Sequence, residues 1–448
     1  MSNLSRLSQI LIDESKRLEP CVAEVCADEV SEIKVVYENT DFSVASNSHA
    51  TIFGLRTVVN NRMGFITTNS LDEAELKDKA REAQMVARLS PESQFHLMAE
   101  KQKTAAFYSI YDDKLALAQP KDIFRWAQLL VDESRKDSSV TLDRVEVSVT
   151  VNKRLIQNSN GVFQEVRLAS CNWFVMGMAK KGDEVTSFDY EGNSSGTYPE
   201  IESKIKDTAR EFRESVVESL GARGAKSYKG PVLFHPSAVG SLLAGVIGFN
   251  VNGRAQQDGM SKWKDQLGKQ VAHKEFSLLE SPLDETRVSD WSPFDREGVL
   301  TETHEIVKNG TLQFTAHNCF SAARGKTKPT GNAVGSSRSL PSIGLHGLTV
   351  ATGKSTLNDL NSALKTGLVL KRFSGNSDPV SGQFSGVAKN SWWVENGERS
   401  YPLKEVMLAG NMFELLNNIK LIGSESFRQM GSFDSPYILI DNVSVTSG

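Results

Sequence analysis

Apolar residues recur at helical spacing near the N-terminus, which predicts an amphipathic first helix. The positions that form this stripe are Leu4, Leu7, Ile10, Leu11 and Leu18. Ser70 and Glu73 have the spacing of a capping box that would open a second helix. Pro120 suits the first turn of a third helix. Three helices are therefore expected after the first, over about 70–89, 120–135 and 199–220.

A period of two replaces the helical spacing from Thr141 onward. Alternating valines, at positions 145, 147, 149 and 151, predict a half-buried strand of an antiparallel sheet. Further strands are expected over residues 33–37, 51–59, 161–166, 172–178 and 184–190, and residues 90–119 are expected to form a long connection. Gly221, Gly224 and Gly230 indicate a linker. The first half is therefore predicted to be an α+β domain over residues 1–225.

The second half is predicted to begin with a strand over 232–234 and a helix through residues 242–247. Asn309-Gly310 and Asn396-Gly397 are typical of tight hairpin turns, and a strand is expected over 299–307 before the first of them. Asn411 and Glu414 predict the start of a short helix to about residue 419. Strands over 437–440 and 443–445 would complete a β-rich domain over residues 226–448. The fold class expected for the whole chain is α+β, with helices and an antiparallel sheet in the N-terminal domain.

Length and charge narrow the possible functions. At 448 residues the chain exceeds what one hydrophobic core usually supports, so two or three domains are expected. The net charge of −4 gives no attraction to nucleic acid or to an anionic membrane, and neither is expected as a partner. The uncharged stretch over 231–253 contains His235, Pro236 and several glycines, so a buried helix is expected there rather than a bilayer span. The first residues lack a signal-peptide core, and four scattered cysteines suit a reducing compartment, so the chain is expected in the cytoplasm.

Several short motifs occur in order along the chain. They are Asn158-Ser159-Asn160-Gly161, Asp295-Arg296-Glu297-Gly298, Ser321-Ala322-Ala323-Arg324-Gly325, Pro329-Thr330-Gly331, Gly382-Gln383-Phe384-Ser385-Gly386, Glu395-Asn396-Gly397 and Gly410-Asn411. Residues 321–331 are expected to form an irregular segment. This series resembles the family that contains the paired bacterial proteins TldD and TldE, the latter also called PmbA. The resemblance implies a metallopeptidase-related protein of a family also named as modulators of DNA gyrase.

One position departs from the proteolytic branch of that family. Its members carry H-E-x-x-x-H on a helix, with two imidazoles for zinc and a glutamate that activates water. The matching segment here, after the strand at 232–234, is His235-Pro236-Ser237-Ala238-Val239-Gly240. The glutamate is replaced by Pro236 and the second imidazole by Gly240. The resemblance therefore implies a TldE/PmbA-like chain with no metal ligands and no cofactor, which acts as the partner of a metal-bearing TldD-like subunit.

The remaining candidate chemistry is weaker. His235, Ser237, His317 and Ser385 are candidate contacts in a substrate groove, and His317 with Cys319, two apart on an expected strand, could join His235 at a metal. The pair His304-Glu305 lacks a second histidine at zincin spacing, so a surface pair on a hairpin is expected. The serines lack a G-x-S-x-G elbow. Trp392 and Trp393 are adjacent on an expected strand, so one is expected in the core and the other toward a ligand or a subunit.

Three functions remain open from the sequence. The first is a TldE/PmbA-like subunit, in a homodimer or a heterodimer, that supports proteolysis of unfolded peptides or peptide maturation around a cavity for extended peptide. The second is an autonomous hydrolase with an unrecognised site near His235, His317 and Cys319. The third is a non-enzymatic interaction protein that modulates a cytoplasmic target.

Overall fold

The computed structural model describes residues 2–38, 40–103, 110–404 and 406–447. The elements of the first half are α1 (Asn3–Leu18), β1 (Val22–Glu38), β2 (Asp41–Val59), β3 (Arg62–Thr68), α2 (Glu73–Leu89), α3 (Asp113–Ala116), α4 (Pro120–Ser134), β4 (Val140–Asn158), β5 (Phe163–Lys181), β6 (Glu184–Val185), β7 (Asp189–Ser195), a 3-10 turn (Tyr198–Glu200) and α5 (Ile201–Glu218). The chain is mixed α+β, with antiparallel sheets and a β-rich C-terminal half, which confirms the predicted fold class.

The second half carries most of the short strands. Its elements are β8 (Tyr228–Phe234), α6 (Pro236–Asn250), α7 (Gly253–Gln257), β9 (Leu278–Glu280), β10 (His304–Lys308), β11 (Thr311–Leu312), α8 (Cys319–Gly325), β12 (Ala333–Val334), β13 (Ser342–Ile343), β14 (Leu348–Val350), α9 (Leu357–Leu364), β15 (Gly367–Leu370), β16 (Arg372–Ser377), β17 (Gln383–Lys389), β18 (Ser391–Glu395), β19 (Glu398–Leu403), β20 (Val406–Asn411), α10 (Met412–Asn417), β21 (Ile419–Ile422), β22 (Phe427–Gln429), β23 (Phe433–Ser435) and β24 (Ile438–Ser447).

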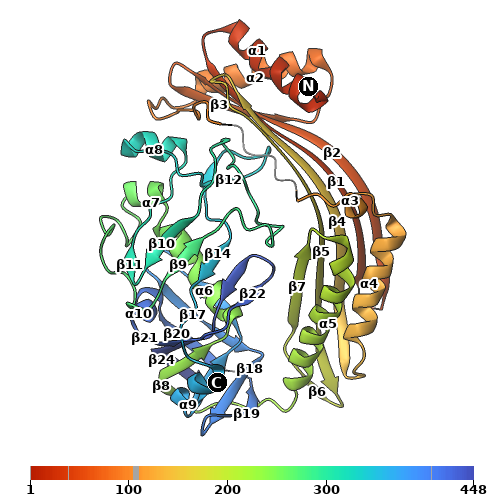
Figure 1. Ribbon diagram of the computed structural model, residues 1–448, viewed down its shortest axis with the longest axis vertical. Helices are drawn as coiled ribbons and strands as arrows, with labels where there is room; N and C mark the ends of the chain where they lie inside the picture. Colours follow the sequence, from red (N-terminus) through yellow and green to blue (C-terminus); the bar gives the residue numbers. More distant parts are fainter. Residues whose placement is uncertain (1, 39, 104–109, 405, 448) are drawn as a thin grey trace.

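The first half is built on a strongly curved sheet of seven strands in the order β3-β2-β1-β4-β5-β6, with β7 also paired to β5 (Figure 1). β1 has 17 residues and β2, β4 and β5 have 19 each, so they are much longer than the predicted strands. The separate strands expected over 161–166 and 172–178 are one strand, β5. Polar side chains interrupt the apolar pattern, but continuous pairing with both neighbours holds the backbone extended through them.

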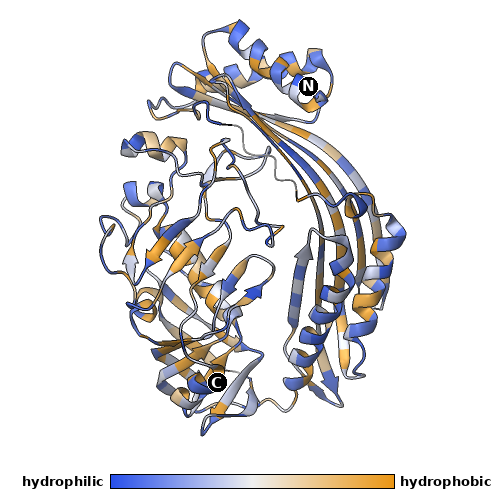
Figure 2. Cartoon of the chain, in the orientation of Figure 1, coloured by the Kyte–Doolittle hydropathy of each residue, from blue (hydrophilic) through white to orange (hydrophobic). Residues whose placement is uncertain are grey.

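Helices cover this sheet at two places. α4 and α5 contact each other and pack on one core, around Trp126 and Phe212, whereas α1 and α2 pack around Leu11 and Phe53 at the other end of the strands. Figure 2 shows that these helices carry both hydrophilic and hydrophobic stretches, as expected of helices with one buried side. The predicted cap of α2 was wrong by two residues. Asp72, not Ser70, accepts hydrogen bonds from the first-turn amides of Ala74 and Glu75.

The second half packs two sheets around α6. A nine-stranded sheet has the order β16-β17-β20-β24-β8-β15-β18-β19, with β21 on β24, and a six-stranded sheet has the order β11-β10-β9-β14-β23-β22. α6 contacts β16 of the larger sheet and β22 and β23 of the smaller one, and its Leu242, Leu243, Val246 and Ile247 belong to the main core. The uncharged stretch over 231–253 is thus β8 and a buried helix. In the part of the chain that the structure describes, no helix is long and apolar enough to cross a bilayer.

Both predicted asparagine-glycine hairpins are present. Asn309 and Asn396 have φ values of 48° and 55°, and they connect β10 to β11 and β18 to β19. Two neighbouring predictions were wrong. The strand expected over 299–307 is regular only from His304, and the irregular segment expected after Ser321 contains α8, because Asn318 accepts a hydrogen bond from the amide of Ser321 and caps this helix.

The two halves are joined by a buried chain of charges. Arg296 donates to Glu24 at 2.9 Å, Arg56 donates to Glu24 at 2.7 Å, and Arg56 donates to Glu297 at 2.9 Å. Glu24 and Glu297 are fully buried. We call Glu24, Arg56, Arg296 and Glu297 the buried charge chain. The Asp295-Arg296-Glu297-Gly298 motif therefore connects the C-terminal half to β1 and β2 through these ion pairs.

Candidate functional site

A cavity of about 600 Å³ lies where the curved sheet and α5 face the C-terminal half. From the first half it is lined by Glu191, Gly192 and Asn193 on β7 and by Thr208, Glu211, Glu214, Ser215 and Glu218 on α5. From the second half it is lined by His235, Lys371, Trp392, Arg399, Tyr437 and residues 426–430. His235 and Trp392, which were both singled out from the sequence, line this cavity.

His235 lies at the junction of β8 and α6, and its imidazole caps the helix. The Nδ1 atom accepts a hydrogen bond from the amide of Ser237 at 3.1 Å and lies 3.0 Å from the Ser237 hydroxyl. That hydroxyl donates to Oε1 of Gln429 at 2.5 Å, and the ring packs edge-on against Tyr437. Burial and the nearby charges of Lys371 and Arg372 lower the pKa of His235 to about 3. The ring is therefore neutral at physiological pH, with Nδ1 as an acceptor.

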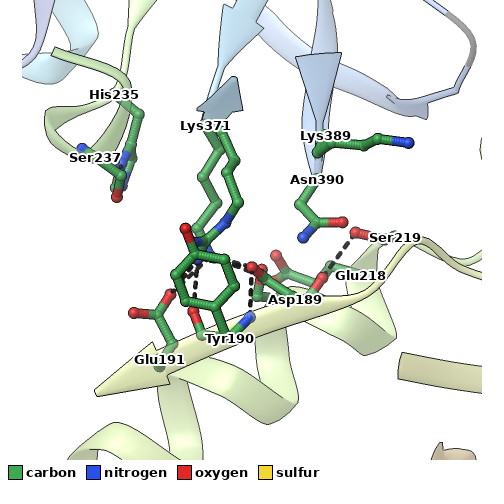
Figure 3. Close-up of polar contacts among 12 residues, drawn as sticks. Asp189, Tyr190, Glu191, Glu218, Ser219, His235, Ser237, Lys371, Lys389 and Asn390 are labelled. Carbon is green, nitrogen blue, oxygen red and sulfur yellow. Dashed lines mark hydrogen bonds and ion pairs between the residues drawn. The ribbon is translucent and has the colours of Figure 1, made fainter. Parts of the chain in front are cut away.

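A cluster of four charges, Asp189, Glu191, Lys371 and Arg372, borders the cavity through Glu191 and Lys371 (Figure 3). Lys371 extends from the second half toward β7, where its Nζ lies 3.4 Å from Glu191 and 3.5 Å from Asp189, and donates to Ser215 at 2.5 Å. Arg372 lies 2.7 Å from Asp189, and its guanidinium stacks on the ring of Tyr190. Asp189 also accepts a hydrogen bond from Ser215. These contacts are a second ionic connection between the halves, and they hold β7 and Ser215 of α5 against residues 371 and 372.

The cluster gives its two carboxylates different proton affinities. Burial would raise the pKa of Asp189, but the charges of Lys371 and Arg372 outweigh it and hold that pKa below its usual range. Burial raises the pKa of Glu191, because its attraction to Lys371 does not compensate for lost hydration and the repulsion of Asp189 adds to the shift. Asp189 is therefore the carboxylate of the cluster that keeps its negative charge, and Glu191 is the carboxyl that takes up a proton more easily.

Acidic side chains follow the exposed face of α5 that borders the cavity. Glu211, Glu214 and Glu218 lie three to four positions apart, so they share this face. Glu218 is paired with Arg399 at 2.7 Å, and the Arg399 guanidinium stacks 3.4 Å from the ring centroid of Trp392. Both tryptophans are buried, but Trp393 belongs to the main core whereas Trp392 borders the cavity. The wall thus offers carboxylates on one side and imidazole and aromatic groups on the other.

Known proteins match this chain over most of its length. Residues 227–447 match the PmbA/TldA metallopeptidase C-terminal domain, and residues 23–87 match domain 1 of the same metallopeptidases. The chain belongs to the PmbA/TldD family. Among its relatives, a metalloprotease PmbA homolog of Haemophilus influenzae is 24% identical over 95% of this chain and 92% of that protein. A metalloprotease of Methanocaldococcus jannaschii is 22% identical over 82% of each chain.

Solved structures show the same fold. TldE from Thermococcus kodakarensis superimposes with a TM-score of 0.86 at 20% identity, over 99% of this chain and 100% of that chain. A Thermotoga maritima protein described as a proposed modulator of a DNA gyrase superimposes with a TM-score of 0.85 at 22% identity, over the same shares. The family fold therefore extends from the curved sheet through the C-terminal half.

The start of α6 does not fit a zinc site built on the pattern H-E-x-x-x-H. Nδ1 of His235 is already used as the helix cap, and the next position is Pro236. A Cβ added at Gly240 would lie 3.0 Å from the ring of Phe433, so an imidazole there would displace that ring. Among the described residues, no group of three His, Cys, Asp or Glu side chains is placed to hold a metal ion. The described side chains at the start of α6 therefore do not reproduce that pattern.

The other candidate residues lie apart from His235, except Ser237. His317 is in the loop before α8, where its Nδ1 lies 3.1 Å from the Ser321 hydroxyl, and Cys319 begins α8, so neither is on the expected strand. Cys319 is buried and borders a different cavity, of about 460 Å³. Ser385 is exposed on β17 and does not line the His235 cavity. His304 is stacked on Phe314 and bonded to Glu280.

The charged cluster was missed by sequence reasoning. Asp189 and Glu191 alternate on one strand, and Lys371-Arg372 follow directly after the buried strand β15. Two adjacent cations beside a buried strand are a signal that a carboxylate partner is needed, because unpaired buried charges are costly. The partners lie about 180 positions away in the sequence and cannot be assigned without the fold.

Proposed function

We propose that this chain is a TldE/PmbA-like subunit that binds no metal and supports the proteolysis of unfolded peptides or the maturation of peptides. It works as a homodimer or as a heterodimer with a metal-bearing TldD-like subunit, which supplies zinc and the glutamate that activates water. The observation that carries this proposal is the segment His235-Pro236-Ser237-Ala238-Val239-Gly240. Its one imidazole caps α6, and Phe433 occupies the space beside Gly240.

The strands beside the cavity support an extended peptide as the substrate. β7 pairs only with β5, and β22 pairs only with β23, so each strand has an unpaired edge among the described residues. Residues 191–193 of β7 and 427–429 of β22 both line the cavity. An extended peptide that pairs with such an edge is held through its backbone, which suits cleavage with little dependence on sequence.

The first experiment measures metal content and peptidase activity. Purified alone, the chain is expected to hold no stoichiometric zinc by elemental analysis and to leave an unfolded peptide intact. Addition of a family member with intact H-E-x-x-x-H is expected to give more cleavage than that member shows alone. One tightly bound zinc per chain, or cleavage by the isolated chain, would overturn the proposal.

A cavity variant tests where the peptide binds. Glu214 lines the cavity on an exposed face of α5, whereas Glu202 lies on the same helix, is also exposed and does not line the cavity. Glu214→Trp is expected to lower the stimulated cleavage by filling part of the cavity, and Glu202→Trp is the matched control. Equal effects of the two variants would show that the substrate binds elsewhere.

Two other functions are tested by the same samples. An autonomous hydrolase would need His235, His317 and Cys319 to act together, and these three residues do not line a common cavity. If the isolated chain were such a hydrolase, replacing each of these three residues with alanine would lower its activity. An interaction protein would copurify from cells with a target other than a family member.

We also propose a cytoplasmic location, supported by four cysteines that form no disulfide. We further propose a domain boundary near residue 225, which lies in the connection between α5 and β8.

A further inference from the structure

A second cavity, of about 650 Å³, lies where α2 and β3 at one end of the curved sheet face α7 and α8 of the C-terminal half (Figure 1). Among the described residues, none lines both this cavity and the His235 cavity. Its volume is within the range of pockets that bind small molecules. We call it the Phe320 cavity, and its apolar wall is formed by Met63, Phe65, Val86, Leu97, Phe320 and Leu340.

Large apolar side chains are exposed around this cavity. Val86, Leu97 and Leu340 are all exposed, and the exposed fraction of Leu97 is 53%. They come from α2, from the segment after α2 and from the loop before β13, so the fold rather than the local sequence brings them together. Exposed apolar side chains that gather at a concave site indicate a ligand, because their burial is favourable.

The ring of Phe320 connects this apolar wall to a positively charged part of the cavity. The imidazole of His96 packs against Phe320 with 5.4 Å between the ring centroids, and the Arg254 guanidinium lies 5.0 Å from the Phe320 centroid. Arg56 also lines the cavity. Burial and the charges of Arg56 and Arg254 lower the pKa of His96. Both guanidinium groups are therefore close enough to act on the same imidazole.

The positive charge of this part of the cavity is not fully compensated. Asp258 is shared between Arg254, whose Nε lies 3.7 Å away, and Arg324, so two arginines share one carboxylate. Of the described residues that line the cavity, only Glu92 is acidic, and it lies 3.7 Å from Arg62. The Arg254 side chain is 60% exposed. An anionic group is therefore the complement of this part of the cavity.

The uncharged polar side chains of the cavity already form hydrogen bonds within the protein. The Ser90 hydroxyl donates to a carbonyl of α2, and the Ser93 hydroxyl accepts from the amide of Phe95. Asn318 caps α8. A bound peptide would bring several amide groups that need partners, and burying such groups without partners is costly. A ligand with one charged group and an otherwise apolar body fits this cavity better.

We propose that the Phe320 cavity binds a small carboxylate with an apolar body. Its carboxylate accepts hydrogen bonds from Arg254, and its apolar body lies between Phe320 of the C-terminal half and Val86 and Leu97 of the first half. This site goes beyond the proposed function, because it lies outside the cavity assigned to the peptide.

Calorimetric titration with sodium octanoate tests the site, and 1-octanol is the neutral control ligand. Octanoate is expected to bind with a dissociation constant below about 1 mM. Octanol is expected to bind at least about tenfold more weakly, because it cannot form a charge-assisted hydrogen bond with Arg254.

Two pairs of variants locate the bound ligand. Arg254→Gln is expected to raise the dissociation constant of octanoate by about tenfold or more. Arg88→Gln is its control, since Arg88 is exposed on α2 and does not line the cavity. Val86→Trp is expected to fill part of the cavity and to weaken octanoate binding by about tenfold or more. Met85→Trp is its control, because Met85 is exposed on the same helix outside the cavity.

Each result decides the inference separately from the proposed function. Absence of octanoate binding up to about 10 mM would overturn it, and equal affinities for octanoate and octanol would exclude recognition of a carboxylate. Unchanged affinity in Arg254→Gln or Val86→Trp would place the ligand elsewhere. Tighter binding of N-acetyl-leucyl-phenylalanine than of octanoate would assign the cavity to a peptide C-terminus instead. Zinc in the isolated chain would overturn the proposed function and leave this site unchanged.

Discussion

Arg296 donates a hydrogen bond to Glu24 at 2.9 Å, although 272 positions separate them in the sequence. Arg56 continues this buried charge chain, because it donates hydrogen bonds to Glu24 on one side and to Glu297 on the other. Arg296 also donates to the carbonyl of Ser336 at 3.0 Å. The turn that carries Arg296 and Glu297 is therefore fixed to both β1 and β2, and the C-terminal half has a defined position on the curved sheet.

Arg56→Ala is expected to destabilise the protein by about 3–5 kcal/mol, because it leaves the carboxylates of Glu24 and Glu297 buried with fewer partners. Urea unfolding followed by circular dichroism measures the change. Arg88→Ala is the matched control, since the Arg88 side chain is 62% exposed and pairs with Glu19 at the surface, and it is expected to cost less than about 1 kcal/mol. Equal losses for the two variants would contradict a stabilising role of the charge chain.

Gly298→Ala tests the packing of the same turn. Gly298 has a φ of 79°, and an added Cβ would lie 2.6 Å from Val162. Gly182 has a φ of 62° but nothing within 4 Å of its added Cβ, so Gly182→Ala carries only the backbone strain of about 1–2 kcal/mol. Gly298→Ala is expected to cost about 1–3 kcal/mol more in the free energy of unfolding. Equal values would show that the turn can move away from β4 and its neighbours.

His235 is expected to make stability fall on acidification. Burial and the charges of Lys371 and Arg372 lower its native pKa to about 3, whereas the unfolded chain takes up the proton near its ordinary pKa of 6.5. Between these values only the unfolded state binds the proton, so the free energy of unfolding decreases as the pH falls, by at most about 1.4 kcal/mol per unit.

The control for this pH dependence is His235→Asn, which keeps a side-chain acceptor at the helix cap and cannot titrate. Urea midpoints measured at several pH values from 7.5 to about 4 are expected to diverge, with the unaltered chain losing more stability than the variant. Parallel curves would mean that the native and unfolded states take up the His235 proton over the same pH range.

Gly240→His tests whether α6 has room for the second imidazole of the zinc motif. The ring of Phe433 lies 3.0 Å from an added Cβ at this position, whereas Gly245, on an exposed turn of the same helix, has nothing within 4 Å. Gly240→His is expected to cost about 1–3 kcal/mol through overpacking, and Gly245→His to stay within about 0.5 kcal/mol. Thermal unfolding of the two variants measures the difference. A stable Gly240→His variant that gains bound zinc would show that the site can be rebuilt.

Local patterns predicted the helices and turns well, because their determinants lie within a few residues. The apolar stripe of α1, Pro120 at the start of α4 and the asparagine-glycine hairpins are confirmed. The strands were predicted too short, since pairing along a whole neighbour extends β1 and β2 through polar stretches that have low strand propensity by themselves. The α8 helix was missed because its small residues and glycine outweighed the cap at Asn318.

By itself, the sequence determined the α+β class, the family and the single imidazole at the start of α6, because six consecutive letters show one histidine and no second. Only the tertiary structure decided which charges surround that imidazole. Lys371 and Arg372 meet Asp189 and Glu191 across the boundary between two different sheets. Such pairs depend on distances of 2.7 to 3.5 Å, and those distances exist only after both halves have packed.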